Sequence, residues 1–100
     1  MAFTKGFRSQ RELTYHFTKH GALLGVQSEE EYLQLADKFC GGPLETGQRA
    51  CTRSSDRDAL RFHEGKQRFG SVRCDNVIRT FYQFDPPHRG EAWFHRQCAS

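Results

Sequence analysis

The repeat pattern of the sequence changes at the Gly41-Gly42-Pro43 turn, and this change constrains the fold more than any other feature. Before the turn, apolar residues recur every three or four positions, the spacing of one face of an α-helix. After the turn, short runs of β-branched and aromatic residues alternate with turn residues, as in antiparallel strands. In a chain of 100 residues, helices followed by strands predict one α+β domain whose helices pack on one face of a sheet.

Two helices are predicted in the first part of the chain, at about residues 9–40. Each begins with a serine followed three residues later by a glutamate, a pair that can cap the first turn of a helix. These pairs are Ser9 with Glu12 and Ser28 with Glu31. We expect the first helix to stop near Gly21, because glycine is a poor helix former. The second helix carries an apolar stripe of Tyr32, Leu35, Ala36 and Phe39.

Three to four antiparallel strands are predicted at about residues 58–96. The segment 60–72 predicts a hairpin around the turn-like residues HEGKQ. The main strand is expected at residues 76–84, where strict alternation gives two faces. One face would carry Val77, Arg79, Phe81 and Gln83, and the other Ile78, Thr80, Tyr82 and Phe84. A short last strand at residues 92–95 would bring Trp93 back against the core.

The four cysteines are Cys40, Cys51, Cys74 and Cys98, and no two of them form a CxxC pair. Their spacing therefore predicts neither a zinc site nor a redox motif. A Cys40–Cys51 disulfide across the Gly-Pro turn and buried free thiols both remain open.

Charge is segregated along the chain although the net charge is only +3. Residues 1–20 and 49–79 are rich in Lys and Arg, whereas residues 21–48 run acidic. A segregated distribution favours a polyanion-binding surface. No apolar run approaches the roughly 18 residues of a membrane span, and the N-terminus lacks the apolar segment of a signal peptide. We therefore expect no membrane span, and action outside the producing cell would require a longer carrier.

The first predicted helix places His16, Lys19 and His20 in one patch, because residues three or four apart lie on the same side of a helix. Histidine titrates near neutral pH and can act as a general acid or base, and a fixed cation can stabilise a phosphorane. This combination meets the needs of RNA cleavage without a metal. As an alternative, His16 and His20 have the i, i+4 spacing of a metal-binding pair, but the sequence offers no third ligand at regular spacing.

The main strand adds Arg79, Thr80 and Tyr82 as candidates for contacting a scissile phosphate. Which of them can act depends on which face of the strand is open. Further basic residues are candidate phosphate contacts without assigned roles. These RNA-binding candidates are Arg53, Arg57, Arg61 and Arg73.

Several segments together resemble the C-terminal nuclease modules of bacterial polymorphic and contact-dependent inhibition toxins. The segments are, in order, YHFTKHGALLGVQSEEEYLQLADKF, GGP, RDALRF, RFGSV, NVIRTFYQFDP and AWFHRQ, and they cover about 80 residues. Such modules are similar to the superfamily that links barnase, EndoU, the tRNA-cleaving colicins and RelE. The four cysteines, the RCDN turn and the short segment after Pro86 depart from the family pattern.

The resemblance implies a fold with two N-terminal helices packed on an antiparallel sheet, as the residue pattern also predicts. It implies metal-independent cleavage of RNA, often tRNA, to a 2′,3′-cyclic phosphate without a cofactor. It also implies a cognate immunity protein, with a host activating factor as a further candidate partner. The module would be secreted as the C-terminal part of a larger toxin and would act in the cytoplasm of the target cell.

The mechanism expected from these residues gives the acid/base role to His20 ahead of His16. Lys19 and Arg79 would stabilise the phosphorane, and Thr80 or Tyr82 would position the phosphate. Two other functions remain open on the sequence alone. One is a non-catalytic RNA- or protein-binding module, and the other is a metal-dependent DNase toxin.

Overall fold

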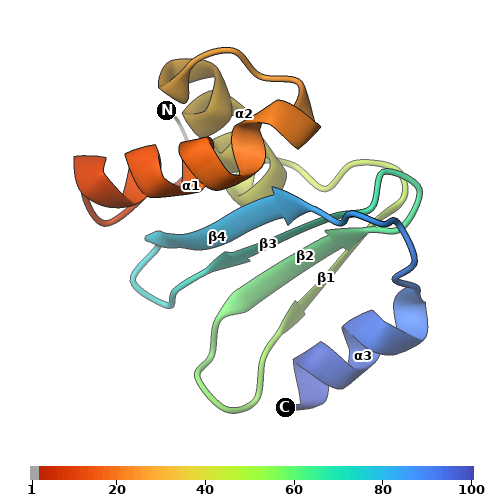
Figure 1. Ribbon diagram of the computed structural model, residues 1–100. Coiled ribbons are helices and arrows are strands. Elements are labelled where there is room, and N and C mark those ends of the chain that lie inside the picture. The colour runs from red at the N-terminus through yellow and green to blue at the C-terminus, as the bar shows by residue number, and fades with distance from the viewer. Residues whose placement is uncertain (1–2) are drawn as a thin grey trace.

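The computed structural model describes residues 3–100 and has three layers (Figure 1). The elements in chain order are α1 (Gln10–Leu24), α2 (Glu29–Gly41), β1 (Gln48–Thr52), β2 (Ala59–His63), β3 (Arg68–Val72), β4 (Ile78–Gln83) and α3 (Glu91–Ala99). The strands form one antiparallel sheet in the order β1-β2-β3-β4. Two N-terminal helices followed by a four-stranded sheet confirm the predicted α+β class. Over residues 3–100, no helix combines the length and the apolar character that crossing a membrane requires.

Both predicted helix caps are present. The Ser9 hydroxyl accepts a hydrogen bond from the Glu12 amide at 3.2 Å, and the Ser28 hydroxyl accepts one from the Glu31 amide at 3.1 Å. The expected end of the first helix near Gly21 is wrong, since α1 continues to Leu24. A Cβ atom at Gly21 would lie 2.8 Å from the ring of Phe17, so this glycine serves close packing inside the helix.

The helical face of the sheet is held by α2. Tyr32 is fully buried, and its hydroxyl donates a 2.5 Å hydrogen bond to the carbonyl of Phe81 on β4. The ring of Phe39 packs against Phe81 with 5.1 Å between the ring centroids. At Gly70 on β3, a Cβ atom would meet the Cys40 sulfur at 2.4 Å, so the missing side chain lets α2 approach the sheet.

The expected alternation along the main strand fails at Arg79. Val72 pairs with Ile78 while Ser71 pairs with Thr80, so Arg79 is an extra residue in β4. Such a bulge shifts the facing of the residues that follow it. Ile78 and Phe81 consequently both belong to the core under α1 and α2, although strict alternation had put them on opposite faces.

The opposite face of the sheet is covered by α3, where a last strand at residues 92–95 was expected. That prediction is wrong, because the segment forms a helix that packs Trp93 and Phe94 onto Phe62 of β2. Glu, Ala, Arg and Gln dominate this stretch and all favour helix. The fourth strand is instead β1, which lies outside the expected strand region of residues 58–96.

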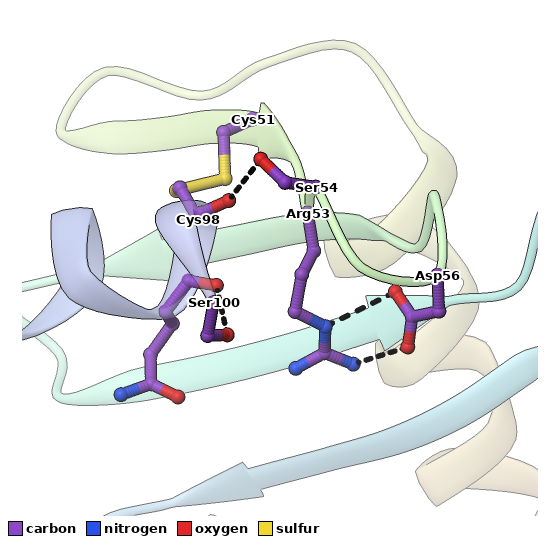
Figure 2. The surroundings of a disulfide bond; sticks show 7 residues. Cys51, Arg53, Ser54, Asp56, Cys98 and Ser100 are labelled. Atoms are coloured by element: carbon purple, nitrogen blue, oxygen red, sulfur yellow. Dashed lines mark hydrogen bonds and ion pairs between the residues drawn. A yellow bond between two sulfur atoms is a disulfide. The ribbon is translucent and has the colours of Figure 1, made fainter.

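A disulfide joins β1 to α3, between Cys51 and Cys98 (Figure 2). Close to it, the Ser54 amide donates a 3.1 Å hydrogen bond to the carbonyl of Cys98. The Cys40–Cys51 alternative is therefore wrong, and the expectation of a buried free thiol holds for Cys40. Burial raises the pKa of the Cys40 thiol to about 12. Cys74 is also free but exposed.

Removing the disulfide should destabilise the domain. The bond closes a segment with a sequence separation of 47, and loss of such a cross-link lowers the free energy of unfolding by about 2 to 4 kcal/mol. We expect this loss in the Cys51→Ser/Cys98→Ser variant, measured by urea denaturation. Wild type in reductant should match the variant, and Cys74→Ser should behave as wild type. An unchanged midpoint for the double variant would contradict the prediction.

Candidate functional site

A row of stacked rings connects α1 to β4. The ring centroids are 5.0 Å apart for Phe7 and His16, 5.9 Å for His16 and His20, and 5.3 Å for His20 and Tyr82. Each pair has an interplanar angle of 27°. The i, i+4 spacing of the two histidines and the position of α1 beside β4 (Figure 1) produce this row. The structure therefore brings together His16, His20 and Tyr82, which the sequence analysis had assigned to two separate halves of a site.

A shallow hollow of about 430 Å³ opens at the end of this ring row. Its lining includes Lys19 and His20 from α1, with Tyr82 and Gln83 from β4. Asp85, just past the strand, is also part of the lining. Lys19 is exposed, and its Nζ lies 5.6 Å from the centroid of the Tyr15 ring. The hollow thus combines an imidazole, a phenol, a carboxylate and an ammonium group within one surface depression. The ammonium group, that of Lys19, also donates a 3.5 Å hydrogen bond to the Tyr15 hydroxyl.

Burial keeps the two histidines neutral. Burial, together with the neighbouring His16 and Lys19, lowers the pKa of His20 to about 4. Burial also lowers the pKa of His16, and Lys19 acts in the same direction, whereas the nearby Glu12 carboxylate raises it. The His16 Nδ1 atom is buried and has no hydrogen-bond partner within residues 3–100. At neutral pH both rings are therefore proton acceptors.

The Arg79 guanidinium is engaged by the carboxylate of Asp58, the residue before β2. The Arg79 Nε donates to Asp58 at 2.5 Å, and its Nη2 donates to the same carboxylate at 3.2 Å. Asp58 is only 1% exposed and also receives a hydrogen bond from Arg53 at 3.2 Å. Thr80 is the partner of Ser71 in the pairing of β3 with β4. In this arrangement the Arg79 guanidinium binds an internal carboxylate. The catalytic roles expected for Arg79 and Thr80 stay predictions.

The arginines proposed as RNA contacts have different surroundings. Arg53 forms two hydrogen bonds with Asp56 (Figure 2), and Arg73 forms an exposed 3.4 Å ion pair with Asp75. Arg61 donates to the carbonyls of Phe39 and Gly42 and so caps the C-terminus of α2. Arg57 has φ 65° at the tip of the β1–β2 turn, and its guanidinium makes no hydrogen bond or ion pair within the described residues.

Arg89, which was not among the predicted site residues, lies close enough to Tyr82 for its charge to act on the Tyr82 hydroxyl. Its guanidinium stacks on the ring of Phe84 at 5.4 Å and on Trp93 at 5.9 Å. Burial raises the pKa of the Tyr82 hydroxyl, which the Arg89 charge lowers in part. The Tyr82 hydroxyl therefore stays protonated and can donate a hydrogen bond. The sequence feature that could have indicated Arg89 is its position beside His88, shortly after the end of the strand that contains Tyr82.

Within residues 3–100, no three His, Cys, Asp or Glu side chains are arranged to hold a metal ion. The i, i+4 pair of His16 and His20 is stacked ring on ring, and the nearest carboxylate to His16 is Glu12 at 3.8 Å. No protein-family model matches the sequence, and no curated protein matches it.

Stability should depend on pH through His20. Its folded-state pKa of about 4 lies below the usual 6.5, so the folded chain binds this proton more weakly than the unfolded chain. The stability that neutral His20 provides is complete above pH 6.5 and is lost as the pH falls toward 4. We expect a loss of roughly 2 kcal/mol over this range that is absent in His20→Gln. Urea denaturation at each pH measures it, with His95→Gln on α3 as control, and parallel wild-type and His20→Gln profiles would contradict it.

Arg79 should contribute to stability through Asp58. Arg79→Ala leaves a buried carboxylate with one of its two arginine partners, and we expect a loss of about 1 to 3 kcal/mol in the free energy of unfolding. Arg73→Ala removes an exposed ion pair with Asp75 and should cost less than about 1 kcal/mol. Equal effects of the two substitutions would contradict this prediction. A loss of RNA cleavage by folded Arg79→Ala would support the catalytic role expected for Arg79.

Proposed function

We propose that this protein is a metal-independent endoribonuclease of the bacterial toxin type that cleaves RNA, with tRNA as the favoured substrate, to a 2′,3′-cyclic phosphate. One observation carries the proposal. A neutral His20 is stacked between His16 and Tyr82 at the edge of a hollow that also contains the exposed Lys19. Neutral imidazole, phenol and ammonium groups in one depression supply a base, a hydrogen-bond donor and a cation to a phosphodiester.

In the proposed reaction, His20 accepts the proton of the 2′-hydroxyl as the 2′-oxygen attacks phosphorus. The bond between phosphorus and the 5′-oxygen breaks, and the histidine pair returns the proton to the departing 5′-oxygen. The products are a 2′,3′-cyclic phosphate and a 5′-hydroxyl, with no net change in protons. Lys19 stabilises the charge that develops on the phosphoryl oxygens, and the protonated Tyr82 hydroxyl donates a hydrogen bond to one of them.

A bound phosphate would also tune the histidines. An anion within about 4 to 6 Å favours the charged form of imidazole and so raises its pKa. The pKa of about 4 for His20 belongs to the protein without substrate. Substrate binding would bring this value closer to neutrality, where a proton carrier is most effective. The low pKa of the free protein is therefore compatible with acid/base catalysis in the complex.

The toxin context rests on the resemblance of the ordered segments and on the disulfide. A Cys51–Cys98 bond is typical of proteins that pass through an oxidising compartment. We propose secretion as the C-terminal part of a larger toxin, action in the cytoplasm of a target cell, and a cognate immunity protein that covers the hollow at His20. A host activating factor is a further candidate partner.

The proposal predicts cleavage of total tRNA in excess EDTA with cyclic phosphate ends. His20→Gln should lower the rate by about 10² to 10⁴-fold, because it removes the proton acceptor. His95→Gln replaces an exposed histidine on α3 and should leave the rate unchanged. Gel electrophoresis with end-group analysis measures both. Cleavage that disappears in chelator, or that survives substitution of both His16 and His20, would exclude this mechanism.

A non-catalytic RNA- or protein-binding module is the second candidate, and one observation favours it. Arg79 is neutralised by Asp58, so one of the expected phosphorane-stabilising cations is engaged elsewhere. Expression in bacteria without an immunity protein separates the two functions, because a ribonuclease toxin would arrest growth and a binding module would not. Plasmid degradation that requires added divalent ions would indicate the third function, a metal-dependent DNase.

A further inference from the structure

The outer side of α1 carries cationic and large apolar side chains in alternation. Arg11, Tyr15, Lys19 and Leu23 follow one another at intervals of four residues and are all exposed. Tyr15 is 56% exposed and Leu23 is 44% exposed, which places them among the most exposed large apolar residues of the described chain. Four residues advance a helix by about 6 Å, so the four side chains form one slanting row. We call this row the α1 track.

The α1 track is continuous with the hollow at His20. Lys19 and Leu23 line that hollow, and the Lys19 Nζ also lies over the Tyr15 ring at 5.6 Å. On the other side of Tyr15, a second depression of about 360 Å³ is lined by Arg11, Glu12 and Tyr15. Tyr15 therefore lines one depression and contacts Lys19, which lines the other. A ligand that enters the hollow at His20 can extend along α1 and meet the Tyr15 ring next.

The charge of this helix face suits a polyanion. Neither Arg11 nor Lys19 forms an ion pair within residues 3–100. The one carboxylate in this part of α1, Glu12, is engaged by Arg8 at 3.2 Å and lies 3.8 Å from His16. Cations on either side of an exposed aromatic ring form the arrangement that binds single-stranded nucleic acid, in which bases stack on rings while phosphates meet cations.

We propose that the α1 track binds the unpaired nucleotides that flank the scissile phosphate, with one base stacked on Tyr15 and phosphates held by Arg11 and Lys19. This inference rests on the proposed function, since it takes the RNA at His20 as its starting point. It narrows the substrate to RNA that is unpaired beside the cleavage site. In a duplex the bases are stacked on one another and turned inward, so none of them can cover the Tyr15 ring.

The test uses a fluorescein-labelled 2′-O-methyl oligonucleotide, which lacks the attacking hydroxyl and therefore binds the wild-type protein without being cut. The same strand is offered single-stranded and paired with its complement, and binding is followed by fluorescence anisotropy. Tyr15→Ala should weaken single-strand binding about tenfold, whereas Tyr15→Phe retains the ring and should bind within about twofold of wild type. Because alanine favours helix and Tyr15 is exposed, we expect Tyr15→Ala to fold normally. An unchanged melting temperature would verify this.

The charges of the track are tested by the dependence of binding on salt. Arg11→Ala should reduce the slope of log affinity against log salt concentration by about 0.7, as for one lost phosphate contact to a single strand. Arg96→Ala removes an exposed arginine of α3, on the opposite face of the sheet, and should leave the slope unchanged. Equal slopes for the two variants would overturn the roles of the cations.

The outcomes separate this inference from the ribonuclease itself. Single-strand binding that is unaffected by Tyr15→Ala, or an equal loss for single strand and duplex, overturns the α1 track even when wild type cleaves tRNA. Binding that depends on Tyr15 in a protein that cleaves no RNA supports the α1 track and overturns the catalytic proposal. Capture of a protein on α1 together with no Tyr15-dependent RNA binding would reassign this surface to a protein partner and also overturn the inference.

Discussion

The structure depends on a sheet that must be covered on both faces, because its strands carry large apolar side chains on each side. Consecutive residues of β4 show this directly: Phe81 packs under α1 and α2, and Tyr82 packs with the opposite core under α3. A domain of this size has little apolar surface to spare. Covering the second face therefore requires α3, and the Cys51–Cys98 bond ties that helix to the outer strand β1. The hollow at His20 lies where α1 passes the end of β4, next to the point at which the two cores meet.

The site follows from the same constraint. Tyr82 belongs to the core under α3, yet its ring also stacks on His20, which projects from α1 on the other side of the sheet edge. The contact requires an edge strand, since a central strand would hide Tyr82 from α1. Burial in this ring row is also the reason that the His20 pKa is low. The packing of α1 is therefore what lowers the pKa of the histidines and keeps them neutral, so that they can accept a proton.

Local patterns in the sequence predicted the helices well, because the capping serines and the apolar stripe of α2 act within a few residues. Apart from the end of α1, which runs past Gly21 to Leu24, the main errors concern contacts that are distant along the chain. The extra residue at Arg79 depends on pairing with β3, and the partner of Cys51 lies 47 residues away. For α3, the helix-favouring residues were present locally, but the aromatic pair Trp93 and Phe94 also suited a strand, and the sheet face that they cover lies far along the chain. The histidine patch was predictable because it is local to α1. The hypothesis of a shared site required this patch to contact Tyr82, but no local pattern could establish a contact between α1 and β4.

Charge illustrates the same difference between sequence and structure. The basic segment 49–79 suggested a nucleic-acid surface, but most of its cations are engaged within the protein, in ion pairs such as Arg79 with Asp58 or in capping such as Arg61 on α2. The first 20 residues hold fewer cations, yet Arg11 and Lys19 are free of ion pairs and lie on one exposed helix face. A field that attracts a polyanion comes from charges without nearby counterions. The arginines of the sheet are more numerous, but the cations without ion pairs lie on α1. We therefore expect a phosphodiester to bind at the hollow beside His20, which Lys19 lines.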